Sequence, residues 1–268
     1  PASETHRPDP YHVWVSEIML QQTRVEAVKA YYARFLTAFP NIKSLANAPQ
    51  DELMKLWQGL GYYSRANNLK RAAIEIEERF HGEFPRTYQE ILSLPGIGEY
   101  TAGAIASIAL GEAVPAIDGN VYRIYTRLFE DDSDITKAAF KKQLRSELLQ
   151  TIPPGTPGIY NQAWMDLGAT ICQPNGAPLC DKCPFVSRCQ AHIHDSWSAF
   201  PVKPPKKKRR IEEKTVILLE YQGTYLVQKR PPKGLLAGLW EFPSQEGFVS
   251  TEELQKLLEQ WDTSASDI

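Results

Sequence analysis

The chain of 268 residues is 43% hydrophobic and 23% charged. This is ordinary globular composition, which excludes a wholly disordered or fibrous protein. The length predicts roughly two domains. No apolar run reaches the roughly 18 residues of a membrane-spanning helix, and no secretion signal is evident, so we expect no membrane partner. Because the net charge is −2, any nucleic-acid contact must come from local patches.

The first two thirds of the chain predict an all-α domain over residues 1–195. Residues 14–39 carry apolar side chains at three- and four-residue spacing, which predicts one long helix with a single buried stripe. The stripe consists of Ile18, Val25, Val28, Tyr32, Phe35 and Phe39. Further helices are predicted over 53–57, 66–80, 88–92, 101–110, 121–129, 137–150 and 160–171.

Composition changes near residue 200. Residues 203–210 read KPPKKKRR, and we interpret this basic run as part of an exposed linker over 196–213, with a phosphate-contacting arm as the alternative. Residues 215–221 and 224–230 predict two β-strands joined by a tight turn, and 251–261 predict a helix. Residues 214–268 therefore predict an α+β domain, and because they are few for such a domain we expect it to be truncated.

Four cysteines lie close together in the sequence. Without a secretion signal, clustered cysteines are more often metal ligands than disulfides. They are Cys172, Cys180, Cys183 and Cys189. Such thiolates hold either a tetrahedral zinc ion or an iron–sulfur cluster, and the spacing alone does not choose between them. Two disulfides or four free thiols are the remaining alternatives.

The segment from Leu94 to Gly98, with Gly96 two residues before Gly98, lies between two predicted helices. Glycines at this spacing allow a sharp turn and close approach to another molecule. The helix that follows offers unpaired N–H groups suited to a phosphate. This is the layout of a helix-hairpin-helix, whose contacts position a duplex without reading its sequence. A plain turn between helices is the alternative.

Two carboxylates stand beside predicted helix starts. Asp118 lies in the segment AIDGNV, where an aspartate is most often an N-cap. Glu17 lies near the start of the first predicted helix, where the ordinary explanation is a first-turn acid favoured by the helix dipole. Spacing alone cannot show that the two face each other.

Six segments in one order make a stronger pattern than any of these alone. They are VSEIMLQQTRV, GLGYYSRA, LPGIGEYTAGAI, IDGNV, YNQAWMDLGATIC and the four-cysteine loop. Together they resemble the helix-hairpin-helix DNA glycosylases, and among them the MutY adenine glycosylases, over about residues 9–190 and again in LVQKRPPKGLLAGLWEFP. The resemblance implies an all-α helix-hairpin-helix glycosylase domain with a [4Fe–4S] cluster on the four cysteines, a linker, and an α+β Nudix-like domain that recognises 8-oxoguanine.

The resemblance also implies roles for residues around the reacting bond. Glu17 matches the acid that donates a proton to adenine, which needs a pKa raised by burial. Asp118 matches the aspartate that stays ionised and stabilises the sugar cation, as in glycoside hydrolysis. Tyr100 and Asn120 match residues that hydrogen-bond around this site.

Other matching positions concern the DNA. Gln22 and Tyr62 match side chains that wedge into the base stack, which lowers the cost of extruding the target base. Leu20 is a weaker wedge candidate. Gln162 matches a position that contacts adenine.

The implied activity is monofunctional hydrolysis of the N-glycosidic bond of adenine mispaired with 8-oxoguanine or guanine in double-stranded DNA, during base excision repair. Relatives that resemble endonuclease III carry a lysine nucleophile where this chain has Tyr100. A phenol cannot form an imine, which argues against the alternative of a pyrimidine-lesion glycosylase with lyase activity. A metal-stabilised DNA-binding module without catalysis is a second alternative. We expect a monomer and, if the source is bacterial, a nucleoid-associated cytoplasmic protein.

Three departures from the family pattern bear on these expectations. Seven residues separate the first two cysteines where the family usually has six, and we expect the loop at 173–179 to absorb the difference. The family's Leu-Pro-Trp-Arg segment is absent before Tyr11, so we expect the chain to begin inside the domain. The loop that reads 8-oxoguanine would fall beyond Ile268.

Overall fold

The computed structural model describes residues 7–205, 211–231 and 233–264. The chain divides into two compact units, Pro1–Pro204 and Pro205–Ile268, which are described separately here as the helical unit and the second unit. The predicted basic run at 206–210 lies outside the described residues. Within the described part of the chain, no helix is both long and apolar enough to cross a membrane.

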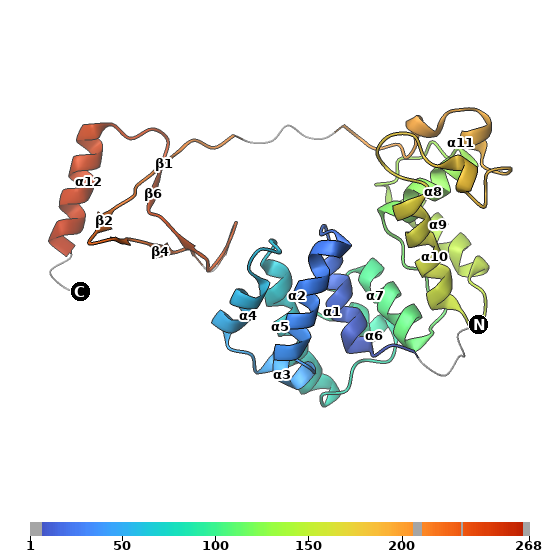
Figure 1. The fold of residues 1–268 in the computed structure, drawn as a ribbon, viewed down its shortest axis with the longest axis horizontal. Coiled ribbons are helices and arrows are strands. Elements are labelled where there is room, and N and C mark those ends of the chain that lie inside the picture. Colours follow the sequence, from blue (N-terminus) through green and yellow to red (C-terminus); the bar gives the residue numbers. More distant parts are fainter. Residues whose placement is uncertain (1–6, 206–210, 232, 265–268) are drawn as a thin grey trace. The chain divides into compact units, whose positions relative to one another are not determined.

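The helical unit is all-α, as predicted, and its helices follow one another with short connections (Figure 1). Its elements are α1 (Pro10–Leu20), α2 (Val25–Ala38), α3 (Ile42–Ala46), α4 (Gln50–Trp57), α5 (Ser64–Phe80), α6 (Tyr88–Leu92), α7 (Glu99–Ile105), the π-helical η1 (Ala106–Leu110), α8 (Gly119–Phe129), α9 (Ala138–Thr151), α10 (Pro157–Thr170), the 3₁₀ turns η2 (Cys180–Lys182) and η3 (Trp197–Ala199), and α11 (Gln190–Ile193). The short helices α3 and α11 were not predicted.

The prediction of one helix over 14–39 is wrong, because α1 and α2 are separate helices. Asp9 caps α1 and Pro10 occupies its first turn. Arg65, from α5, donates to the carbonyls of Ile18 and Gln21, which a continuing helix would need for its own hydrogen bonds. Val25, assigned to the buried stripe, is 58% exposed. Arg65, which is far from α1 in the sequence, thus takes up the carbonyls at the end of α1. The apolar spacing of residues 14–39 contains no information about this contact.

The 101–110 prediction also differs in detail from the structure. The helix begins at Glu99 and its last residues, Ala106–Leu110, form a π-helix rather than an α-helix. Such widened turns are rare and are frequently found at functional sites.

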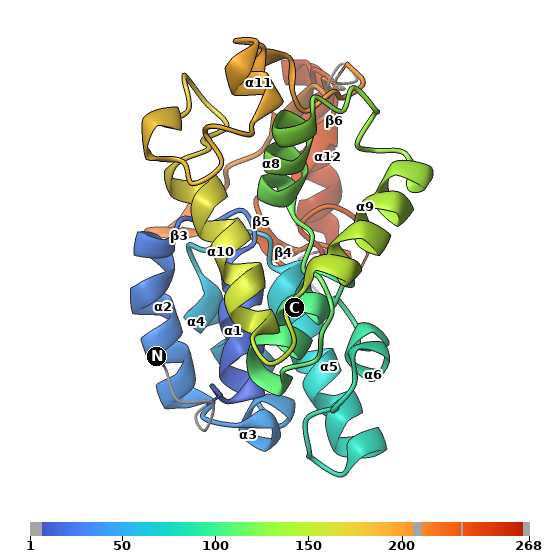
Figure 2. The same ribbon diagram turned by 90° about the vertical axis from the view of Figure 1, so that its right-hand side faces the viewer.

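Two groups of buried side chains stabilise the helical unit. The larger is built mainly from α1 to η1 and contains Trp14, Phe35, Trp57 and Ile105. The smaller involves α8 and α9. Helix α10 packs against both α8 and η1 (Figure 2). Glu17 and Tyr100 are carried by elements of the larger group, whereas Asp118 lies at the start of α8.

In the described residues of the second unit there are short antiparallel strand pairs and one helix. Its elements are β1 (Lys214–Val216), β2 (Glu220–Tyr221), β3 (Thr224–Tyr225), β4 (Gln228–Lys229), β5 (Trp240–Glu241), β6 (Ser244–Glu246) and α12 (Thr251–Ser264). β2 pairs with β3 across the predicted turn, where Gln222 and Gly223 both have positive φ, as tight hairpins require. Each of the two longer predicted strands is instead two short strands with different partners: β2 pairs with β3, whereas β1 pairs with β6 and β4 with β5.

Candidate active site

Glu17 lies in the interior of α1, not in its first turn, so the helix-dipole explanation of this residue is wrong. Its Oε2 accepts a hydrogen bond of 2.9 Å from the Tyr100 hydroxyl. Burial raises the pKa of Glu17, and the charge of Asp118 raises it further, against the lowering effect of the Tyr100 hydrogen bond. The site therefore favours a neutral carboxylic acid at this position.

Tyr100 stands in the first turn of α7, directly after the hairpin. Its hydroxyl lies 3.6 Å from the sulfur of Met165 on α10 in addition to its bond to Glu17. Burial raises the pKa of the Tyr100 phenol, and the neighbouring Glu17 raises it further. The phenol therefore stays protonated and acts as a hydrogen-bond donor.

Asp118 is the N-cap of α8, as the sequence analysis predicted for an aspartate at this position. Its Oδ1 accepts from the backbone N–H groups of Asn120 (2.8 Å) and Val121 (2.9 Å). Its Oδ2 accepts from the Asn120 side-chain amide at 2.7 Å. Three donors and a helix N-terminus suit a negatively charged side chain. Asp118 has a second position of interest besides the cap, because it also lines a cavity.

The two carboxyl groups share that cavity. It has a volume of about 420 Å³ and is lined by Glu17, Leu20, Gln21, Gln22, Tyr100, Asp118 and Gly119. This volume is within the usual range for small-ligand sites, roughly 300–1,000 Å³. A carboxyl group whose pKa is raised by burial and a carboxyl group that accepts three hydrogen bonds thus line the same space, and a pair of carboxyl groups in different environments is the arrangement that glycoside-cleaving sites use.

The other predicted site residues lie around this cavity in different ways. Leu20 and Gln22 line it, and Asn120 lies behind Asp118 as its hydrogen-bond donor. Tyr62 does not line it and is 60% exposed. Gln162 is exposed on α10, where its side chain donates to the carbonyl of Gly158 at 3.0 Å. Gln21, which bonds Thr101 at 3.3 Å, is a lining residue that the sequence analysis missed.

The predicted helix-hairpin-helix is formed by α6, the turn at 93–98 and α7. Gly96 has a φ of +77°, and a Cβ there would lie 2.5 Å from the Cβ of Asn68, so only glycine fits. Gly98 is the N-cap of α7, and a Cβ there would meet nothing within 4 Å. The backbone at Gly98 is therefore open to a partner, next to the unpaired N–H groups of a helix N-terminus.

A buried arginine that the sequence analysis missed connects Asp118 to the cysteine loop. Arg123 donates to the side-chain oxygen of Asn120 (2.7 Å) and to the carbonyls of Gly168 (2.8 Å) and Cys172 (2.8 Å). Since Asn120 in turn bonds Asp118, one side chain couples the start of the cysteine loop to the carboxylate at the site.

All four cysteines line one cavity whose walls include Ile171, Val186 and Trp197. None is in a disulfide, which excludes that alternative in this structure. Arg127 donates to the Cys172 sulfur at 3.4 Å. Among the described residues no three His, Cys, Asp or Glu side chains are gathered tightly enough to hold one metal ion. Four thiols that line one cavity are a donor set suited to a group held by four thiolates.

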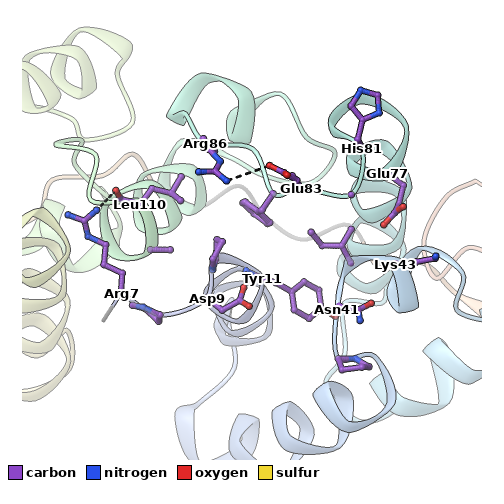
Figure 3. Close-up of a pocket in the computed structure, with 17 residues that line it drawn as sticks. Arg7, Asp9, Tyr11, Asn41, Lys43, Glu77, His81, Glu83, Arg86 and Leu110 are labelled. Atoms are coloured by element: carbon purple, nitrogen blue, oxygen red, sulfur yellow. Dashed lines mark hydrogen bonds and ion pairs between the residues drawn. The ribbon is translucent and has the colours of Figure 1, made fainter. Parts of the chain in front are cut away.

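A larger cavity, of about 850 Å³, lies elsewhere in the helical unit and contains none of the predicted site residues. Figure 3 shows it between the segment before α1, the start of α3 and the end of α5. Three of its charged side chains have partners nearby: Arg7 donates to the carbonyl of Leu110 at 2.7 Å, and Arg86 pairs with Glu83 at 3.5 Å. The cavity that Glu17 and Asp118 line is thus smaller than this one.

Residues 15–150 match the family model of the HhH-GPD superfamily base excision DNA repair proteins, and residues 215–267 match that of the NUDIX domain. An adenine DNA glycosylase of Buchnera aphidicola is 37% identical over 247 residues, covering 92% of this chain and 71% of that protein. This chain belongs to the adenine DNA glycosylase family. The helix-hairpin-helix fold and the family resemblance predicted from the sequence are therefore confirmed.

Human adenine DNA glycosylase is 38% identical over 292 residues, which cover 92% of this chain and 53% of that protein. The chain thus spans about half the length of its human relative. Among solved structures, a thermostable thymine-DNA glycosylase has a TM-score of 0.63 at 28% identity, covering 71% of this chain and 87% of the other. An endonuclease III–DNA complex has a TM-score of 0.61 at 23% identity, covering 72% and 88%, and supports the fold.

Proposed function

We propose that this chain is a monofunctional DNA glycosylase that hydrolyses the N-glycosidic bond of adenine mispaired with 8-oxoguanine or guanine, in base excision repair. The observation that carries the proposal is the shared cavity in which Glu17, Tyr100 and Asp118 meet. Membership of the adenine DNA glycosylase family supports adenine as the base released.

The neutral carboxyl of Glu17 is the proton donor. Adenine leaves poorly as an anion, so protonation at N7 makes the bond between the sugar carbon and the base nitrogen easier to break. Tyr100 keeps the Glu17 carboxyl oriented through their 2.9 Å hydrogen bond. Adenine departs with the bonding electrons and leaves a positively charged sugar.

Asp118, which lines the same cavity, stabilises that positive charge. Its oxygens are held by Asn120 and Val121, so the anion is in place before charge develops. Water then adds to the sugar carbon and gives up a proton to the solvent, which leaves free adenine and an abasic site. Tyr100 offers no amine for an imine, so strand cleavage does not follow.

The DNA is held by the hairpin and opened by the wedge residues. The open backbone at Gly98 suits a phosphate contact, and Gln22, Tyr62 and Leu20 suit insertion beside the extruded base, with Gln162 toward adenine. The second unit, through its NUDIX-like fold, would contact the opposite base. We propose domains at 1–195 and 214–268 joined by the 196–213 linker, acting as a monomer and, in a bacterium, in the cytoplasm at the nucleoid.

We propose a [4Fe–4S] cluster on Cys172, Cys180, Cys183 and Cys189. Four thiols lining one cavity suit a group held by four thiolates, and membership of the base excision repair glycosylase family supports the cluster rather than a zinc ion. The four cysteines would hold the cluster and so tie together the loop from 172 to 189, and the cluster would supply one-electron redox chemistry there. Arg127 contributes a positive charge beside the Cys172 sulfur.

The test is single-turnover cleavage of a duplex that carries one 8-oxoguanine·adenine pair, with and without alkali. We expect abasic sites, seen as strand breaks after alkali treatment alone. Breaks without alkali would indicate lyase chemistry, and binding without base loss would indicate a non-catalytic module.

A further inference from the structure

Arg65, near the start of α5, is a buried arginine with no role in the reaction described above. It is 9% exposed, and its guanidinium joins two separate segments of the surface, the turn at 21–24 after α1 and the turn at 58–63 before α5. Its Nη1 donates to carbonyls at the end of α1 and in the turn at 21–24, and its Nη2 donates mainly to carbonyls of the turn at 58–63. The carbonyl acceptors are Ile18 (2.7 Å), Met19 (3.0 Å) and Gln21 (2.8 Å) for Nη1, and Leu60 (3.1 Å) and Gly61 (3.2 Å) for Nη2.

Two of these acceptors stand directly before the wedge residues. Gln21 precedes Gln22, and Gly61 precedes Tyr62. Gln22 has a φ of +57° and Tyr62 a φ of +47°, a left-handed conformation that residues with a side chain rarely adopt. A carbonyl shares its peptide plane with the next residue's nitrogen. By fixing the Gln21 and Gly61 carbonyls, Arg65 therefore fixes the planes from which both unusual φ angles are measured.

The guanidinium also contacts the Tyr62 side chain. Its central carbon lies 5.6 Å from the centre of the Tyr62 ring and 5.3 Å from that of Trp57, within the range of cation–π attraction. Because Tyr62 remains 60% exposed, the ring is held on one side and presented to solvent on another.

We propose that Arg65 is a positioning residue for base extrusion, which holds the backbones of Gln22 and Tyr62 in the conformation that enters the base stack. The inference rests on the proposed function and deepens it. It requires an arginine, because a planar fork with two NH₂ groups reaches both turns at once, whereas a lysine ammonium donates from a single point.

The test compares Arg65→Lys with Arg71→Lys, an exposed arginine on the same helix. Each variant is assayed in single turnover on two duplexes. One carries an 8-oxoguanine·adenine pair in matched sequence, and the other has the same pair flanked by mismatches, so that the adenine is already unstacked. Duplex opening is followed separately in the Glu17→Gln background, through the fluorescence of 2-aminopurine placed beside the target adenine.

We expect Arg65→Lys to slow adenine release from the matched duplex by about 10- to 100-fold, and by less than about 3-fold from the mismatch-flanked duplex, because opening no longer limits the rate. The 2-aminopurine signal should fall in parallel, while Arg71→Lys matches the parent. Equal losses on both duplexes, or an unchanged fluorescence signal, would overturn the proposal.

Folding of the variants is checked by thermal unfolding, and Arg65→Gln provides a second variant without a buried charge. Loss of the folded state in both, with Arg71→Lys folded, would make Arg65 a general stabiliser and overturn the positioning role. If the parent opens the duplex but releases no adenine, the proposed function fails while the fluorescence comparison still decides the role of Arg65.

Discussion

Glu17 is a carboxyl group placed where its charged form is disfavoured. Burial is the main cause of its raised pKa, and the Tyr100 hydrogen bond offsets part of the effect. Protein side chains with such perturbed acidity gather at functional sites, and the same perturbation has separate consequences for reaction rate and for stability.

The rate of adenine release should fall as pH rises through the raised pKa of Glu17, because only the protonated form donates. We expect Glu17→Gln to lower the single-turnover rate by at least about 100-fold and to remove this pH dependence. Glu26→Gln, on the exposed surface of α2, is the matched control. A pH profile of the parent that rises through the same range would contradict the assignment of Glu17 as the acid.

The same substitution should stabilise the protein at neutral pH. Between the ordinary glutamate pKa and its raised folded value, the unfolded chain releases the proton while the folded protein keeps it, so the parent loses stability as pH rises. Below the ordinary value both states are neutral and the difference disappears. Thermal unfolding should therefore show a higher Tm for Glu17→Gln than for the parent at pH 7, and equal Tm values for the two proteins near pH 4. A lower Tm for the variant at pH 7 would contradict a raised pKa of Glu17 in the folded protein.

The hairpin between α6 and α7 uses its two glycines for different purposes. Gly96→Ala places a Cβ against Asn68 at a positive φ and should cost about 1–3 kcal/mol of unfolding free energy. Gly98→Ala has open space and should leave stability unchanged while weakening duplex binding, because the added methyl group blocks close approach. Denaturant titration and fluorescence anisotropy on a labelled duplex separate the two effects. Equal stability losses would show that Gly98 is also structural.

Helix α8 depends on Arg123 to join its start to α10 and to the cysteine loop. Arg123→Met removes hydrogen bonds to the carbonyls of Gly168 and Cys172 and to Asn120. Because buried carbonyls lose a charged donor, we expect a loss of about 3 kcal/mol, measured by urea unfolding. A change in unfolding free energy below about 0.5 kcal/mol, the usual size for surface sites, would show that the hydrogen bonds of Arg123 add no stability.

At the scale of the whole molecule, the four-cysteine cavity predicts a coloured protein. Anaerobically purified chain should absorb visible light and contain four iron and four sulfide per chain, if the [4Fe–4S] proposal is correct. Cys183→Ser should reduce the iron content and the Tm together. A colourless protein with one zinc per chain would replace the cluster with a mononuclear site.

The sequence predicted most helices of the first unit, because their apolar spacing is local information. It also selected Glu17, Tyr100 and Asp118, through segments whose order resembles a known family, although spacing could not show that they share a cavity. Arg65 and Arg123 escaped prediction because their acceptors are mostly backbone carbonyls, which every residue type supplies. The strands of the second unit are shorter than predicted for a related reason. β1 pairs with β6, which is distant in the sequence, and no local pattern specifies that partner.

The guanidinium of Arg65 is held by neutral oxygens rather than by carboxylates. Dissolved ions screen contacts between charged groups, so they strongly weaken the contacts of a protein with DNA phosphates. The acceptors of Arg65 are uncharged carbonyls, so salt has no charged partner of Arg65 to screen. Raising ionic strength should therefore release the duplex from the surface while leaving the turns at 21–24 and 58–63 as they are. Capture of DNA and distortion of DNA would then respond to salt as two separate steps.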